Sequence, residues 1–228
     1  MPRETLDNKI QHLLDEILVL DSMVEQATID AVNALKQRDL ASAKRIYDGD
    51  IAINTKRYKL ENECITTIAT QQPIMAGDLR LMASILEVIG ELERMGDYAK
   101  GIAKIAIMMG DQPPVKPLID IPRMSEIVVD MLHRAVGAFV NKDAEQASII
   151  PDEDDQVDDL YNQVYRELVT VILSNPRTID GANYLMWAAH NLERMADRVT
   201  NICERTLYVV TGELKEIDRS DDETQLEI

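Results

Sequence analysis

The chain has 228 residues, of which 46% are hydrophobic and only 4% aromatic, with nine glycines and eight prolines. This composition excludes general disorder and is typical of long helices rather than of a sheet protein with many turns. The net charge of −17 excludes a broad nucleic-acid surface and argues against attraction to anionic lipid, because both need an excess of Lys and Arg.

The same sequence predicts a cytoplasmic protein. No apolar run approaches the ~18 residues of a membrane-spanning helix, and the N-terminal stretch MPRETLDNKI has no secretory apolar region. Cys64 and Cys203 lie in separate helical segments without a CxxC motif, so we expect buried free thiols in a reducing compartment. We expect no direct insertion into a membrane.

Three helices are predicted in the first half of the chain. The first ends at Arg38, and Asp39 is a candidate N-cap for the second, which the QQP sequence at 71–73 ends. The third runs from about residue 74 to residue 109. The first helix carries apolar residues three and four apart, which predicts one buried face: Ile10, Leu13, Ile17, Leu20, Val24, Ala27, Ala31 and Ala34.

Residues 110–122, GDQPPVKPLIDIP, contain four prolines and cannot form the interior of a helix. We interpret this stretch as a linker between two halves of the chain. Pro122 suits the first turn of the following helix, which we expect to run from Arg123 to Asn141.

The second half repeats the order of the first. After a break at Lys142–Asp143, a longer helix is interrupted near Ile150–Pro151 and ends at SNP, 174–176. A last helix is expected from about 178 to 210, with Gly212 just after its end and a charged tail to residue 228. The predicted fold is all-α: two tandem, pseudo-symmetric three-helix bundles with six long helices, divided into residues 1–111 and 112–228.

One short acidic motif occurs at matched points of the two halves. LERMGD at 92–97 contains Glu93 and Asp97, and LERMAD at 192–197 contains Glu193 and Asp197. Residues four apart lie on one face of a helix, so two carboxylates can converge on one cation. Because apolar residues occupy the preceding positions of the same face, we expect a neighbouring helix to pack there.

The expected neighbours are the second helix of each half, where Asp50 and Asn54 match Asp154 and Asp158. Oxygen-bearing side chains from two facing helices would form a site for a hard cation. His190, three residues before Glu193, is either an added ligand or a packing residue. In the alternative interpretation the acidic pairs are partly exposed and are balanced by nearby arginines. We expect four other acidic residues to face solvent: Asp48, Glu91, Asp155 and Asp159.

No enzymatic motif is found in the sequence. It has no Gly-rich phosphate loop, no GxSxG and no plausible Cys–His pair, and the Glu-x-x-His pairs of di-iron bundles are missing. We therefore predict that the protein is not an enzyme.

Over nearly its full length the chain resembles the PhoU family of bacterial phosphate-transport regulators. The resemblance rests on the two three-helix halves, LERMGD, HNLERMADRVTNICE, the QQP turn followed by GDLR, and the paired acidic positions. It implies a symmetric six-helix fold and metal binding through E/DxxxD motifs. The implied ligands are Asp50, Asn54, Glu93 and Asp97 in one half and Asp154, Asp158, Glu193 and Asp197 in the other. The neutral Asn54 weakens the first site.

The resemblance also implies a role and partners. Members of the family couple the ATPase subunit of the phosphate ABC transporter to a phosphate sensor histidine kinase, and they repress the phosphate-starvation response. A homodimer is common among them. The metal, whether iron, zinc, manganese or magnesium, stays open. The alternatives are a ferritin-like oxidase, a metal-storage or structural bundle, and an accessory protein of another phosphate permease.

Overall fold

The computed structural model describes residues 2–217; residue 1 and the tail from 218 to 228 lie outside the described part, so the predicted charged tail is covered only as far as residue 217. Within residues 2–217 there are helices and no strand. The elements are α1 (Pro2–Gln37), α2 (Leu40–Thr70), α3 (Ala76–Met109), α4 (Asp120–Asn141), α5 (Ala144–Ile149), the 3₁₀ turn η1 (Ile150–Glu153), α6 (Asp154–Ser174), the 3₁₀ turn η2 (Pro176–Thr178) and α7 (Ile179–Thr211).

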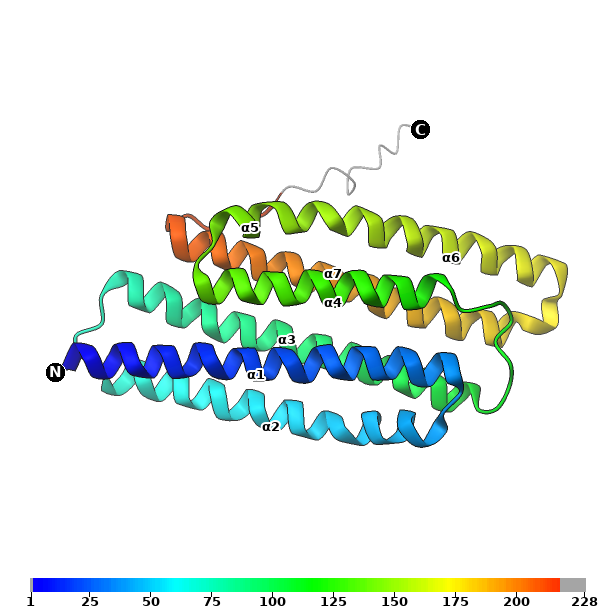
Figure 1. Ribbon diagram of the computed structural model, residues 1–228, viewed down its shortest axis with the longest axis horizontal. Helices are drawn as coiled ribbons and strands as arrows, with labels where there is room; N and C mark the ends of the chain where they lie inside the picture. Colours follow the sequence, from blue (N-terminus) through cyan, green and yellow to red (C-terminus); the bar gives the residue numbers. More distant parts are fainter. Residues whose placement is uncertain (1, 218–228) are drawn as a thin grey trace.

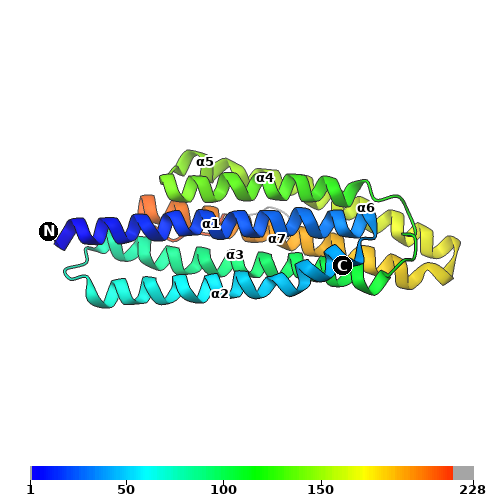
Figure 2. The same cartoon turned by 60° about the horizontal axis from the view of Figure 1, so that its bottom comes forward.

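The six long helices run along one common axis in two related halves (Figure 1). Helices α1, α3, α4 and α7 form the centre, where α3 packs extensively on α7 and α1 packs beside α4. Helix α2 lies against α1 and α3 at one edge, and α6 lies against α4 and α7 at the other (Figure 2). The predicted fold class is confirmed. The division at residues 111 and 112 falls in the non-helical connection between α3 and α4, and its role as a domain boundary stays a prediction.

The helix ends repeat between the halves because the same local signals set them. Asp39 caps α2 by accepting a hydrogen bond from Ser42 N at 3.0 Å, and Asp143 caps α5 by accepting one from Gln146 N at 3.0 Å. The residue before each cap, Arg38 or Lys142, has a positive φ of 58° or 56°. This left-handed residue turns the chain so that the next helix packs back on the previous one.

The predicted breaks are confirmed with small shifts. Helix α2 ends at Thr70, before Pro73, and α6 ends at Ser174, before Pro176. Helix α4 begins at Asp120, three residues earlier than predicted, because Pro122 sits in the first turn, where a missing N–H breaks no helical hydrogen bond. The interruption at Ile150–Pro151 is the turn η1.

One continuous cluster of buried apolar residues runs through both halves. Along α1 the predicted buried face is confirmed, with Ala27 only partly buried. The largest fully buried side chains are leucine, isoleucine and methionine, together with Phe139. Cys64 and Cys203 are buried and form no disulfide, as predicted, and burial raises the pKa of Cys64 to about 12. Among residues 2–217, no helix has the length and apolar character needed to cross a membrane.

Candidate metal centre

In the first half, the predicted ligands lie on two helices that pack against each other, α2 and α3. Asp50 is only 4% exposed and Glu93 9% exposed, so both carboxylates lie at the helix–helix contact. The side chain of Asp97 is 51% exposed. The expected neighbouring helix therefore covers Glu93, whereas Asp97 lies at the solvent-exposed edge of the contact between α2 and α3.

Positively charged side chains already pair with these carboxylates. Lys100 Nζ lies 2.6 Å from Asp50 Oδ2 and 3.6 Å from Asp97 Oδ1, and Arg57 Nη1 lies 2.7 Å from Glu93 Oε1. The hydrogen bond to Asp50 raises the pKa of Lys100, which keeps this amine charged. The charge that a metal ion would supply in the first half is thus supplied by the chain itself.

Asn54 also disfavours a metal ion in the first half. Its Nδ2 donates a hydrogen bond of 2.8 Å to Asp50 Oδ2, so the amide of Asn54 serves as a donor to the carboxylate. For Asn54 to bind a cation through its oxygen, this hydrogen bond would have to be broken. The structure thus adds a reason to the one seen in the sequence why the first site is the weaker of the two.

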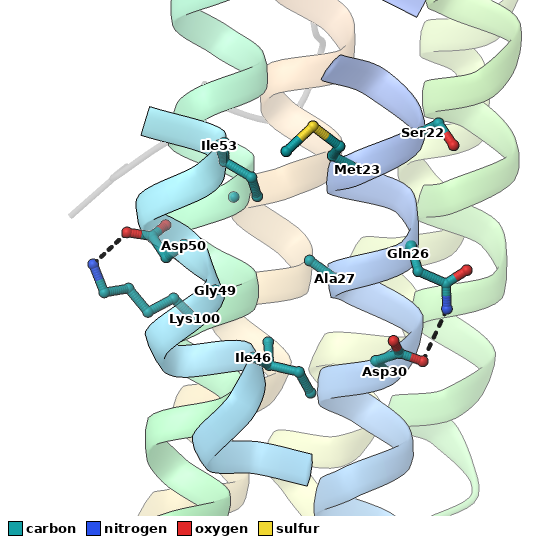
Figure 3. Close-up of a pocket in the computed structure, with 11 residues that line it drawn as sticks. Ser22, Met23, Gln26, Ala27, Asp30, Ile46, Gly49, Asp50, Ile53 and Lys100 are labelled. Atoms are coloured by element: carbon teal, nitrogen blue, oxygen red, sulfur yellow. Dashed lines mark hydrogen bonds and ion pairs between the residues drawn. The ribbon is translucent and has the colours of Figure 1, made fainter. Parts of the chain in front are cut away.

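The Asp50–Lys100 pair borders a pocket of about 420 Å³ that α1, α2 and α3 enclose (Figure 3). The pair lies on the α2–α3 side, whereas Gln26 and Asp30, which are hydrogen bonded to each other, come from α1. Between these two polar edges the walls are mostly apolar, with Met23 and Ile53 facing across the pocket. The pocket therefore presents one ion pair at its edge and no ring of oxygen ligands.

The second half places its acidic residues on α6 and α7. Asp154 is 3% exposed, and Asp158, Glu193 and Asp197 are half-buried. Burial, then the charges of Asp197 and Asp158, raise the pKa of Glu193, so these three carboxylates are close neighbours. His190 opposes this shift, and its Nδ1 lies 2.9 Å from Glu193 Oε2.

The two halves differ at the positions that supply positive charge. A shift of 104 residues relates α2 to α6, and a shift of 100 relates α3 to α7. Tyr161 then stands where the first half has Arg57, and Thr200 stands where it has Lys100. Asp158 replaces Asn54, which adds a carboxylate. The second cluster thus keeps all of its acidic residues and lacks both of the cations that pair with the first.

Arg57 and Lys100 were missed in the sequence, although a signal for them is present. Arg57 follows Asp50 by seven residues, and Lys100 follows Glu93 by seven, so each lies on the same helical face as a predicted ligand. The sequence suggested Arg94, Arg194 and Arg198 as balancing charges. Arg94 and Arg198 pair with Glu91, and Arg194 lies over the ring of Tyr98.

The prediction that Glu91 faces solvent is wrong. Glu91 is 5% exposed because α7 of the other half packs across this face of α3. Its carboxylate pairs with Arg94 on its own helix and lies 3.6 Å from Arg198 on α7. Asp48, Asp155 and Asp159 are exposed as predicted.

The donor set of the second half fits a metal ion better than that of the first. Carboxylate oxygens with one imidazole nitrogen suit a divalent cation, whereas Lys100 and Arg57 repel one. Among residues 2–217, the side chains that bring three ligand atoms within 4.8 Å of one another are Asp21, Glu25 and His133, outside the predicted centre. Metal binding by the eight predicted residues, and by His190, stays a prediction.

The sequence was compared with protein families, curated proteins and solved structures. The sequence model of the PhoU domain matches residues 17–106 and again residues 121–206, one copy in each half. The chain belongs to the PhoU family. The twofold match explains why helix caps, proline breaks and acidic motifs recur at the same shifts.

Relatives and solved structures cover nearly the whole chain. The phosphate-specific transport system accessory protein PhoU homolog of Aquifex aeolicus is 36% identical over 92% of this chain and 94% of its own. The accessory protein PhoU of Escherichia coli K12 is 33% identical over 90% and 85%. The crystal structure of PhoU from Pseudomonas aeruginosa, 32% identical, matches with a TM-score of 0.85 over 91% of this chain and 99% of that one.

Proposed function

We propose that this PhoU-family protein is an accessory and negative regulator of phosphate-specific transport. The observation that carries this proposal is the match to curated accessory proteins of that transport system over nine-tenths of the chain, with both halves included. The match includes both halves, so it extends over most of each relative and is not limited to one repeat. The role would be that of a cytoplasmic adaptor between the ATPase subunit of the transporter and a phosphate sensor histidine kinase, with repression of the starvation response when phosphate is plentiful.

The adaptor role is tested by deletion and by capture. Deletion of the gene should derepress phosphate-starvation genes in phosphate-rich medium, and the tagged protein should capture the transporter ATPase and the sensor kinase from phosphate-replete cells. Unchanged expression in the deletion strain would contradict the regulatory role. Oxygen consumption by the purified protein with Fe²⁺ would instead support the oxidase alternative.

The adaptor would hold a metal ion in its second half. Asp154 and Asp158 on α6 and Glu193 and Asp197 on α7 would supply oxygens, and His190 is placed to supply a nitrogen. A bound cation would offset the burial and the neighbouring carboxylates that raise the pKa of Glu193, and it would fix α6 against α7. In the first half, Lys100 and Arg57 would balance the carboxylates and hold α2 against α3 without a metal.

This asymmetry gives a matched pair of variants. Glu193→Gln should weaken binding of Mn²⁺ or Zn²⁺ to the metal-free protein by about tenfold or more, because a charged ligand is lost. Glu93→Gln, at the equivalent position, should leave metal affinity unchanged, because the Glu93 carboxylate is already paired with Arg57. Isothermal titration of both variants and the parent measures the difference.

Equal losses in the two variants would show that both halves bind metal, and no loss in either would remove the second-half cluster from the proposal. Capture of the transporter ATPase by the Glu193→Gln protein shows whether the adaptor role depends on metal binding. If metal binding is lost and capture persists, the adaptor role stands and the ion is not needed for docking.

A further inference from the structure

A group of three possible metal ligands lies between the two halves, away from the acidic motifs. Asp21 and Glu25 are four residues apart on α1 and share one helical face, and His133 comes from the neighbouring α4. His133 Nδ1 lies 3.0 Å from Glu25 Oε1, and one ligand atom from each of the three residues lies within 4.8 Å of the other two. Helices α1 and α4 run side by side in both views of the molecule (Figures 1 and 2).

Asp21 is the least accessible member of this group. Its side chain is 97% buried, with 3% exposure, and its Oδ1 has no hydrogen-bond partner. A buried carboxylate oxygen without a donor is costly, so it needs either a proton nearby or a cation. Glu25 lies one helical turn away on the same face, so the two carboxylates also repel each other.

The group opens onto a groove of about 430 Å³ between α1 and α4. Glu25 and His133 line it, as do Ser125, Glu126 and Asp130 of α4. The side chain of Glu25 is 19% exposed and that of His133 is 73% exposed, so the group is accessible to an ion from solvent. Water in the groove would fill the remaining coordination positions of that ion.

The group is not a copy of the acidic motifs. A shift of 104 residues also relates α1 to α4, since it takes Arg38 to Lys142, and it places Ser125 opposite Asp21 and Val129 opposite Glu25. The ligand set therefore occurs once, at the contact between the halves, whereas the acidic motifs occur within each half. It lies on α1 and α4, and the acidic motifs lie on α2, α3, α6 and α7.

We propose that Asp21, Glu25 and His133 bind one divalent transition-metal ion, Zn²⁺ in the first place, that joins α1 to α4. Two carboxylate oxygens and one imidazole nitrogen are a donor set that Zn²⁺ uses, and the imidazole disfavours Mg²⁺ and Ca²⁺. The ion gives the buried Asp21 oxygen a partner and removes the repulsion between the two carboxylates. Because the ligands come from both halves, binding ties the halves together in the folded state.

The test is a Zn²⁺ titration of the metal-free full chain in a Glu193→Gln, Asp158→Asn background, which weakens the second-half cluster and so separates this site from the proposed function. We expect one Zn²⁺ per chain and a higher unfolding temperature with the metal. Adding His133→Gln or Glu25→Gln should weaken binding about tenfold or more. His12→Gln is the matched control, since His12 also lies on α1, 3.7 Å from a glutamate, and should bind as the background protein does.

The ¹⁵N resonances of the imidazoles give a second readout, measured on the background protein with His133 in place. The chain has three histidines, so each resonance is assigned by single substitution. Saturating Zn²⁺ should shift the ring nitrogens of His133 and leave those of His12 in place. Unshifted His133 resonances, or background affinity in His133→Gln, would overturn the proposal.

Discussion

At the residue scale, single polar side chains connect segments that are distant in the sequence. Asp78 is the clearest case, because it joins the beginning of α1 to the first turn of α3. It accepts hydrogen bonds from both Arg3 Nη atoms, at 2.5 and 3.0 Å, and one from Met75 N at 3.3 Å. It therefore ties the beginning of α1 to the first turn of α3.

The Arg3–Asp78 contact predicts a pH dependence. The hydrogen bond from Arg3 lowers the pKa of Asp78 below its ordinary 3.8, so the folded state binds this proton less tightly than the unfolded state. The stabilisation is present above about pH 4 and is lost as pH falls through the folded pKa. Asp78→Asn should lower the unfolding temperature by about 1–3 °C at pH 7 and by less at pH 3.

Asp7→Asn is the control for this measurement. Asp7 also lies 3.0 Å from Arg3, but its side chain is 52% exposed and it caps no helix. Thermal unfolding followed by circular dichroism at both pH values should show a pH-dependent loss of unfolding temperature for Asp78→Asn and a smaller loss for Asp7→Asn. A loss for Asp78→Asn that is the same at pH 3 and pH 7 would assign the effect to helix capping alone.

At the element scale, the halves fill the contact between their second and third helices differently. Gly96 on α3 faces Ile53 on α2, and a Cβ at Gly96 would lie 3.1 Å from two carbons of that isoleucine. In the second half the equivalent residues are Ala196 and Val157. One half pairs a glycine with the larger side chain, and the other pairs an alanine with the smaller one, so each keeps the two helices close.

This exchange predicts that the two positions are coupled. Ile53→Val alone should cost about 1 kcal/mol of unfolding free energy, because it removes a buried methylene. In a Gly96→Ala background the same change should cost at least about 0.5 kcal/mol less, because the valine makes room for the new methyl group. Urea unfolding of the four proteins measures the coupling.

Gly90 supplies the control for this cycle. It lies on the same helix, and a Cβ there would meet nothing within 4 Å. Gly90→Ala and Ile53→Val should therefore be additive. If Gly96→Ala and Ile53→Val are additive as well, the two positions are not coupled and the prediction is wrong.

At the scale of the whole molecule, the two halves share one interior. Helices α3 and α7 pack along each other, and the residues buried on both faces of α3 include Leu92 and Met95 from the acidic motif itself. The pair between buried Glu91 and Arg198 crosses the same contact. Separating the halves would expose this apolar surface and break the Glu91–Arg198 pair.

We therefore predict that residues 1–111 and 112–228 do not behave as stable monomers when each is expressed alone. Co-expressed, they should form a 1:1 complex, because α3 and α7 then regain their contact, and the intact chain should unfold in one cooperative step. Size-exclusion chromatography with light scattering measures the association state, and urea unfolding measures the cooperativity. Two monomeric halves that each unfold cooperatively would instead establish the boundary at residues 111 and 112 as one between independent domains.

The sequence by itself determined the helices, their ends and the twofold repeat. Asp39, Asp143 and the prolines at 73 and 176 act on neighbouring residues, and their effect is the same wherever the helix lies in the fold. It also determined that acidic residues recur at matched positions. Only the tertiary structure decided which carboxylates have a positive partner, that Glu91 is buried, and that His133 meets Glu25. These contacts join residues that are distant in the chain, so they depend on how each helix is rotated against its neighbours, which the spacing within one helix does not fix.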